Sequence, residues 1–153
     1  MGRAAGLVEA VAAAGTDAFV ADTAPIIYRV ERSADPGLVA ASDPLFEAVE
    51  DGSLGCLVSA VSVAELLIEP FRAGPAAVSA VDGFLRQPRL GVVELDGAIA
   101  RTAAELVARA RVGRLPDALV AATSIEYGLP LVTGDRRLAR ALAPDALLVS
   151  DFR

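Results

Sequence analysis

The chain has 153 residues, of which 54% are hydrophobic, and a formal net charge of −6. It is therefore long enough to form one domain with its own core. It contains no His and one Cys, which excludes Ser-His-Asp and Cys-His catalysis, His-ligated zinc and an internal disulfide. All 14 basic residues are Arg, and the absence of Lys excludes P-loop and Schiff-base chemistry. Carboxylates, hydroxyls, arginines and a bound metal remain as the means of catalysis.

The N-terminal stretch 2–15 is rich in Ala, but Glu9 interrupts it and its positive start is a single Arg. We therefore expect a short amphipathic helix rather than a signal peptide. No apolar run is long enough to span a bilayer, so we expect a cytoplasmic protein without membrane contact. The chain 1–153 is expected to be a single domain in which residues 1–16 form a helical extension. Its surplus of apolar residues is expected in a buried sheet or a protein interface.

Five short apolar runs, bounded by polar or turn-forming residues, predict buried strands. A helix is expected from Thr23, because Pro25 is tolerated in a first helical turn. A second helix follows the loop 33–37 and ends near the turn-forming pair Asp51-Gly52. The strands are expected at 18–22, 54–59, 90–95, 130–134 and 146–150, and further helices at 75–87, after Asp96, from Asp117 and at 135–142.

Helix ends give two further expectations. Ser62 is predicted to cap the helix that carries Glu65, with Glu65 at its third position in a capping box. Pro70 and the pair Gly74-Pro75 are expected to break this helix. Asp96 is expected to cap a long helix with four apolar residues on one face, namely Ile99, Ala103, Leu106 and Val107.

The alternation of strands and helices predicts an α/β fold. Because each strand is almost entirely apolar, the sheet is expected to be mostly parallel and covered by helices on both faces. We therefore predict a three-layer αβα domain with four to five strands and no internal repeat or domain boundary.

Four acidic residues lie just past a strand-like run or at the start of a helical one. The carboxyl ends of parallel strands meet at one edge of a sheet, so these side chains are expected in one crevice. Like charges in one crevice repel and raise one another's pKa unless a cation lies among them. Four carboxylates suit Mg²⁺ or Mn²⁺. The sequence therefore predicts a metal site that handles phosphate, formed by Asp22, Glu65, Asp117 and Asp135.

Each of these acids also has a structural explanation when it is taken alone, because carboxylates are favoured at helix N-termini. Capping is the better explanation for any single one, but four acids at the same edge make coincidence the weaker account. For three other acids we keep the structural interpretation: Asp96 and Asp145 as caps or turns, and Asp151 as a surface charge. Cys56 lies inside an apolar run and is interpreted as a packing residue.

The negative net charge argues against nucleic-acid binding. Bound metal would neutralise several acids, however, and two groups of arginines flank Asp117 and Asp135. A single Arg in such a group is best explained as a solvated side chain. Together the groups are candidate phosphate contacts, and they comprise Arg109, Arg111 and Arg114, then Arg136, Arg137 and Arg140.

Three motifs make the chain resemble the PIN-domain ribonucleases, and within them the VapC toxins of bacterial toxin–antitoxin pairs. The motifs are ADTAPIIY at 21–28, SVAELL at 62–67 and RLPDALVAATSIEYGLPLVTGDRRL at 114–138. The resemblance covers roughly residues 18–150, and its acidic positions fall on Asp22, Glu65, Asp117 and Asp135. The chain departs from the pattern in its leader before Asp22, since such proteins often begin almost directly with the first strand.

The resemblance implies an Mg²⁺- or Mn²⁺-dependent endoribonuclease that leaves a 5′-phosphate and a 3′-hydroxyl. Asp22, Asp117 and Asp135 would hold an ion that generates hydroxide, and Glu65 would help to hold a second ion. The hydroxyls of Thr23 and Thr133 are expected to orient carboxylates or water, with helix or turn capping as an equal alternative. Arg114, Arg136 and Arg137 are the candidate RNA contacts.

Two other functions remain open at this point. One is a catalytically silent PIN scaffold that binds protein or RNA, and the other is an α/β phosphatase-like domain, which the missing Asp-x-Asp pattern and the absence of Lys disfavour. The resemblance also implies a homodimer and a cognate antitoxin that binds an apolar surface. Candidate residues for such surfaces are Ile26, Ile27, Leu45, Phe46, Leu66, Leu67 and Phe71, of which only part can be exposed.

Overall fold

The computed structural model describes residues 6–153 and contains one five-stranded sheet, all of whose pairings are parallel. The strand order is β3-β2-β1-β4-β5, so β1 is central and β5 is an edge strand, as expected. The strands are β1 (Ala18–Ala21), β2 (Gly55–Ser59), β3 (Leu90–Val93), β4 (Leu131–Thr133) and β5 (Ala146–Leu148).

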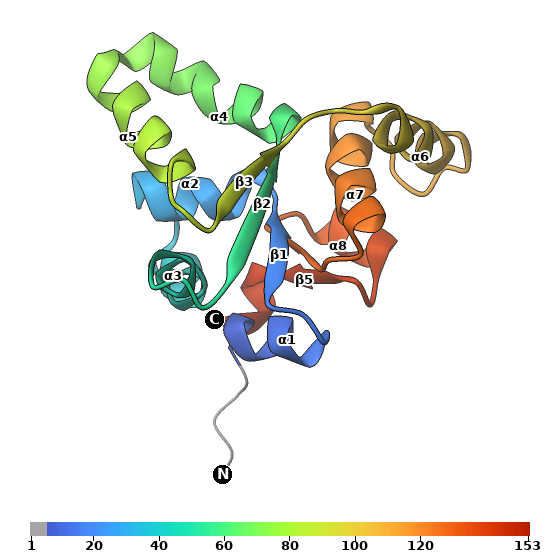
Figure 1. Cartoon of the computed structure of the whole chain (residues 1–153), viewed down its shortest axis with the longest axis horizontal. Coiled ribbons are helices and arrows are strands. Elements are labelled where there is room, and N and C mark those ends of the chain that lie inside the picture. The colour runs from blue at the N-terminus through green and yellow to red at the C-terminus, as the bar shows by residue number, and fades with distance from the viewer. Residues whose placement is uncertain (1–5) are drawn as a thin grey trace.

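Helices cover both faces of this sheet. Figure 1 shows α2 to α5 on one side of the sheet and α6 to α8 on the other. The predicted three-layer α/β architecture is therefore confirmed. The helices are α1 (Leu7–Ala13), α2 (Thr23–Glu31), α3 (Pro36–Glu50), α4 (Ala60–Ala73), α5 (Pro75–Leu85), α6 (Gly97–Ala108), α7 (Leu115–Tyr127) and α8 (Arg136–Leu142), and a 3₁₀ turn spans Val149–Phe152.

The central strand explains the two cores, because successive side chains of a strand point to opposite faces. Phe19 and Ala21 of β1 belong to the core beneath α2 to α5, whereas Val20 belongs to the core beneath α6 to α8. Phe19 packs edge-to-face on Phe46 of α3, which packs in the same way on Phe84 of α5. A strand buried on both sides needs apolar residues at every position, which is why its sequence lacks polar alternation.

The N-terminal extension contributes to the first of these cores. Helix α1 confirms the expected helix within residues 7–13, and residues 1–5 lie outside the described part of the chain. Leu7 and Val11 are buried against the core beside α3. The extension is therefore bound to its own domain through these two side chains.

The expected cap of α4 at Ser62 and its expected break at Pro70 were wrong. Ser59, the last residue of β2, caps α4 by accepting a hydrogen bond from the backbone N–H of Val61 at 3.2 Å. Helix α4 therefore begins at Ala60, Ser62 lies inside its first turn, and Glu65 belongs to no capping box. The helix also continues through Pro70 to Ala73. The predicted break at Gly74-Pro75 is confirmed, and Gly74 has a φ of 132°, which a side chain would disfavour.

Asp96 caps α6 as predicted, accepting a hydrogen bond from the N–H of Ile99 at 2.9 Å. Ile99, Ala103 and Leu106 are buried, whereas Val107 is exposed. Across residues 6–153, no helix combines the length and the apolar character needed to cross a membrane.

The sheet order fixes where a ligand site can form. From β1 the chain crosses to β2 and β3 on one side, and it later returns to β4 and β5 on the other. The carboxyl ends of β1 and β4 therefore lie at a switch in strand order, where open α/β sheets bind ligands. Asp22 directly follows β1, and Asp135 follows β4 after Gly134.

Candidate active site

Asp22 lies at the centre of the site, where β1 ends and α2 begins. Its Oδ1 accepts a hydrogen bond from the N–H of Thr23 at 2.8 Å, and its Oδ2 accepts one from the hydroxyl of Thr133 at 2.8 Å. Burial raises the pKa of Asp22, these two hydrogen bonds oppose the rise, and the charges of Asp117 and Asp135 add to it. The capping explanation for Asp22 is thus correct, but it does not account for the two neighbouring acids.

Thr133 joins the ends of β1 and β4. Its buried hydroxyl donates to Asp22 and accepts a hydrogen bond from the N–H of Asp135 at 3.0 Å. Asp135 in turn caps α8, its Oδ1 accepting from the N–H groups of Arg137 at 2.8 Å and Leu138 at 3.2 Å. One hydroxyl therefore contacts the carboxylate of Asp22 and the backbone of Asp135.

Asp117 and Glu65 reach the same edge from α7 and α4. Burial raises the pKa of Asp117, the charge of Arg114 opposes the rise, and the charge of Asp135 adds to it. Burial also raises the pKa of Glu65, with further increases from Asp22 and Asp117 and a decrease from Arg114. Each of the four predicted acids thus either raises the pKa of another of them or has its own pKa raised by one. The structure brings all four together at one edge of the sheet.

Two residues at this edge had no predicted role. Tyr28 of α2 packs its hydroxyl against Gly134. A Cβ added at Gly134 would lie 2.6 Å from the hydroxyl oxygen of Tyr28 and 3.0 Å from the Cβ of Ala24. Burial raises the pKa of Tyr28, and the charge of Asp22 raises it further. Tyr28 belongs to the motif 21–28, but the sequence does not reveal that α2 packs so closely on the loop after β4.

Gly134→Ala is expected to destabilise the protein by about 1–3 kcal/mol, because the added methyl group overpacks a filled space. The double variant Gly134→Ala/Tyr28→Phe should recover part of this loss, since it removes the closest atom. Urea denaturation of both variants and of Tyr28→Phe alone would measure the coupling between the two positions. Equal stability of Gly134→Ala and the unaltered protein would show that α2 does not pack here as described.

The arginines near the acids line two different pockets. Arg114 and Arg137 line one pocket with Asp117 and Asp135, whereas Arg136 faces a different hollow with Arg140. Of the three candidate RNA contacts, the structure therefore places two beside the acids and one away from them. Cys56 is buried, and burial raises its pKa to about 12, so its thiol is a packing group.

The donor set fits a hard divalent cation, since it consists of carboxylates and burial and neighbouring acids raise the pKa values of three of them, Asp22, Glu65 and Asp117. Two buried hydroxyls in the motifs of these acids, those of Thr23 and Ser62, also have no hydrogen-bond partner among the described residues. Within residues 6–153, however, no three acidic side chains lie close enough together to hold one ion as they stand. Asp22 and Asp135 instead direct oxygens toward Thr133 and backbone N–H groups.

The sequence of residues 18–142 matches the PIN domain. The chain belongs to the PIN-domain family. This is a family of nucleases, and the matched residues include all four acids. Sequence comparison with curated proteins gives no significant match.

Solved structures of the same fold include PIN domains from toxin–antitoxin complexes. The VapBC2 complex of Rickettsia felis, bound to a fragment of its promoter DNA, matches with a TM-score of 0.64 and 18% identity, covering 86% of this chain and 96% of that one. FitAcB from Neisseria gonorrhoeae matches with a TM-score of 0.63 and 19% identity, covering 86% and 98%. DNA-bound VapBC from Salmonella typhimurium matches with a TM-score of 0.62 and 20% identity, covering 88% and 99%. At these identities the likeness shows the fold.

Proposed function

We propose that this PIN domain is a metal-dependent endoribonuclease and the toxin of a VapBC-type toxin–antitoxin pair. The observation that carries the proposal is the gathering of Asp22, Glu65, Asp117 and Asp135 at the sheet edge where β1 and β4 end, with the pKa values of three of them raised. Membership of a nuclease family supports the reaction class. The VapBC and FitAB complexes among the structural neighbours support the toxin assignment.

Each acid has a proposed part in holding Mg²⁺ or Mn²⁺. Asp22, Asp117 and Asp135 would hold one ion, and Glu65, which reaches the edge from the opposite helical layer, would help to hold a second. Bound divalent metal supplies a water of lowered pKa and neutralises charge that develops on the phosphate. Thr133 donates to the carboxylate of Asp22 and accepts from the backbone N–H of Asp135, which keeps these two residues side by side.

Charge at the site also decides how RNA is held. Four carboxylates would repel a phosphodiester, so the substrate needs both a divalent cation and nearby arginines. Arg114 and Arg137 line the pocket beside Asp117 and Asp135 and are the proposed phosphate contacts. The negative net charge of the whole chain is therefore compatible with RNA binding at this one position.

The proposed reaction is tested by incubating the purified chain with single-stranded RNA and Mg²⁺ and determining the chemistry of the new ends. Fragments with 5′-phosphates and 3′-hydroxyls are expected. Fragments with 2′,3′-cyclic phosphates would contradict the proposal, because they arise from attack by the ribose hydroxyl. Binding of RNA without cleavage would favour the silent scaffold instead.

The proposed partners are a second copy of the chain and a cognate antitoxin. Several of the residues considered for such surfaces are buried in the domain itself, namely Ile26, Leu45, Phe46 and Leu66. Phe71, by contrast, is 69% exposed, and its neighbour Ile68 on α4 is 50% exposed. Exposed aromatic and aliphatic side chains on one helix are typical of an interface.

Phe71→Arg is expected to weaken association with a co-expressed antitoxin or with a second copy by tenfold or more, because it places a charge in a buried interface. Co-purification with the product of the neighbouring small gene, together with light scattering of the chain alone, would measure both. Arg72→Ala is the control, since Arg72 is an exposed side chain of the same helix that pairs with Glu69. Unchanged assembly of Phe71→Arg would exclude this face.

A further inference from the structure

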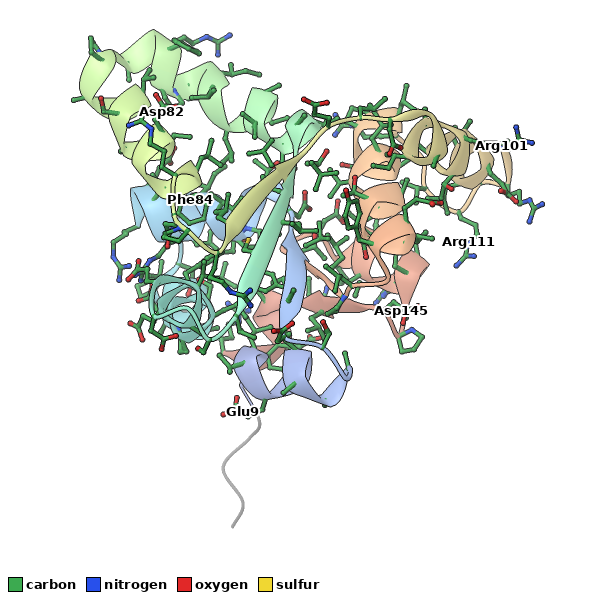
Figure 2. The ribbon with its side chains drawn as sticks, viewed as in Figure 1. Glu9, Asp82, Phe84, Arg101, Arg111 and Asp145 are labelled. Carbon is green, nitrogen blue, oxygen red and sulfur yellow. The ribbon has the colours of Figure 1, made fainter. Side chains whose placement is uncertain are left out.

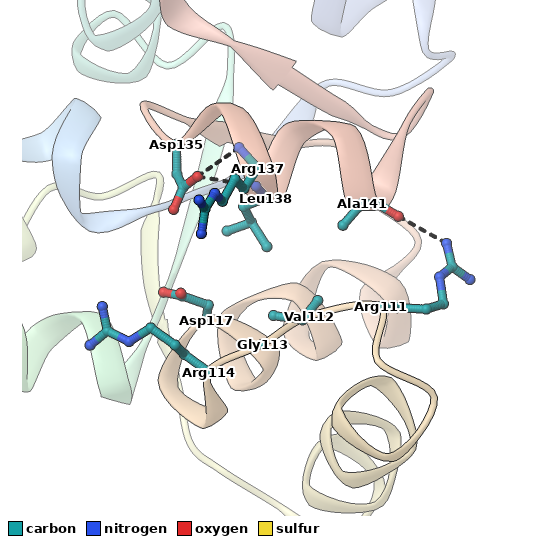
Figure 3. Close-up of a pocket in the computed structure, with 9 residues that line it drawn as sticks. All are labelled: Arg111, Val112, Gly113, Arg114, Asp117, Asp135, Arg137, Leu138 and Ala141. Atoms are coloured by element: carbon teal, nitrogen blue, oxygen red, sulfur yellow. Dashed lines mark hydrogen bonds between the residues drawn. The ribbon is translucent and has the colours of Figure 1, made fainter.

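A pocket of about 260 Å³ adjoins the acids between the α6–α7 loop and α8. Asp117 and Asp135 lie at one end of it, and Figure 3 shows their carboxylates facing the gap between α7 and α8. Arg111 lies at the opposite end, toward Ala141. The pocket thus leads away from the proposed cleavage site and ends at Arg111, an arginine outside the three sequence motifs.

The pocket has three arginines, and its two acids form no ion pair with them. Arg111, Arg114 and Arg137 line it, and none of them forms an ion pair with any residue of 6–153. Arg111 is nevertheless held in place, because its Nη2 donates a hydrogen bond to the carbonyl oxygen of Ala141 at 2.9 Å. The other N–H groups of this guanidinium remain free to donate to an anionic group.

The walls between the two ends are small or aliphatic. They consist of Val112 and Gly113 of the loop and Leu138 and Ala141 of α8. Val112 is buried and its N–H donates to the carbonyl oxygen of Leu106, which ties the loop to α6. The volume lies just below the range of about 300–1,000 Å³ typical of small-molecule pockets, which suits a single nucleotide unit.

We propose that this pocket binds the nucleotide next to the scissile phosphate, with Arg111 contacting the following phosphate of the strand. The proposal rests on the ribonuclease function proposed above. Arg114 and Arg137 would hold the scissile phosphate beside the acids, the nucleoside would lie between the α6–α7 loop and α8, and Arg111 would fix the distance to the second phosphate. Arg111 is then a positioning residue. Because no aromatic side chain lines the pocket, base stacking contributes little, and selectivity for the base at this position is expected to be weak.

The test compares nucleotides with one and two phosphates. In Mg²⁺, adenosine 3′,5′-bisphosphate is expected to bind the unaltered protein about tenfold more tightly than adenosine 5′-monophosphate, as measured by calorimetry. Arg111→Gln should abolish this difference and leave the affinity for the monophosphate within about twofold. The unchanged monophosphate affinity then also shows that the variant is folded. The bisphosphate has a phosphate on each side of its nucleoside, so the comparison holds for either strand direction.

Arg101→Gln is the matched control, because it removes the same charge from a side chain on α6 that lies outside the pocket. Figure 2 shows Arg101 and Arg111 at separate positions on this side of the molecule. Equal affinity of the unaltered protein for the two nucleotides would overturn the proposal, as would an equal loss in Arg101→Gln and Arg111→Gln. Neither nucleotide contains a phosphodiester, so binding is measured independently of cleavage. If the protein bound the bisphosphate more tightly than the monophosphate but cleaved no RNA, the ribonuclease function would be refuted. The binding of two phosphates by the pocket would still be supported.

Discussion

Changing any one of Asp22, Glu65, Asp117 and Asp135 to its amide is expected to reduce RNA cleavage by about 10³-fold or more. An amide keeps the shape of the carboxyl group but removes the charge that binds a divalent cation. Residues that act as a unit in catalysis lose nearly all of their effect when one member is lost. Initial rates at saturating Mg²⁺, corrected for the folded fraction, would measure the reduction for each variant.

Two controls separate this effect from general damage. Asp82→Asn makes the same change at a half-buried position on α5 (Figure 2), a helix that carries none of the four acids, and should leave the rate unaltered. Cys56→Ser changes a buried thiol and should lower stability without changing the rate per folded molecule. If one of the four amide variants retained more than a tenth of the activity, that acid would not be part of the unit.

Mg²⁺ or Mn²⁺ is expected to raise the melting temperature of the unaltered protein. At a hundredfold excess over its dissociation constant, a ligand that binds only the folded state adds about 2.7 kcal/mol to the free energy of unfolding. Asp117→Asn should blunt this response and should also stabilise the metal-free protein, because it removes one of the mutually repelling charges. Asp117 is the best position for this test, since no hydrogen bond to its side chain is present among the described residues, whereas Asp22 has two.

The pH dependence of this response has a definite sign. The pKa values of Asp22, Glu65 and Asp117 are raised in the folded state, so the folded protein binds more protons than the unfolded one between the ordinary and the raised values. The contribution of these groups to stability therefore falls as pH rises through that interval. Melting curves should show the largest stabilisation by metal above the raised pKa values. Curves indifferent to both metals at every pH would refute metal binding at this site.

Much of the fold was predictable because its strands are short, apolar and separated by helices with clear end signals. Asp96 at the start of α6 and the pair Gly74-Pro75 after α4 are such signals, and both were correct. Ser62 misled because two serines lie near the start of α4, and the earlier one, Ser59 at the end of β2, accepts the capping hydrogen bond. A local pattern could not decide between them, since the choice depends on where the strand stops pairing with β3.

The acids of the site were predictable for a topological reason. Residues that follow parallel strands are brought to one edge whatever the details of packing, so Asp22 and Asp135 had to be neighbours. The positions of Tyr28 and Gly134 follow from how closely α2 packs on another loop, and the sequence contains no signal for that distance. Arg136 and Arg137 are adjacent in sequence but face different hollows, a distinction that required the orientation of α8.

The central claim is that this PIN domain cleaves RNA with divalent metal held by its four acids. The most direct measurement is the rate of cleavage of single-stranded RNA by chelator-treated protein as Mg²⁺ is added back, with Asp117→Asn followed in parallel. The account predicts no cleavage without metal, a saturable rise as Mg²⁺ is added, and a rise that is lost or moved to much higher Mg²⁺ in the variant. Cleavage that persists at full rate in the chelator would contradict it.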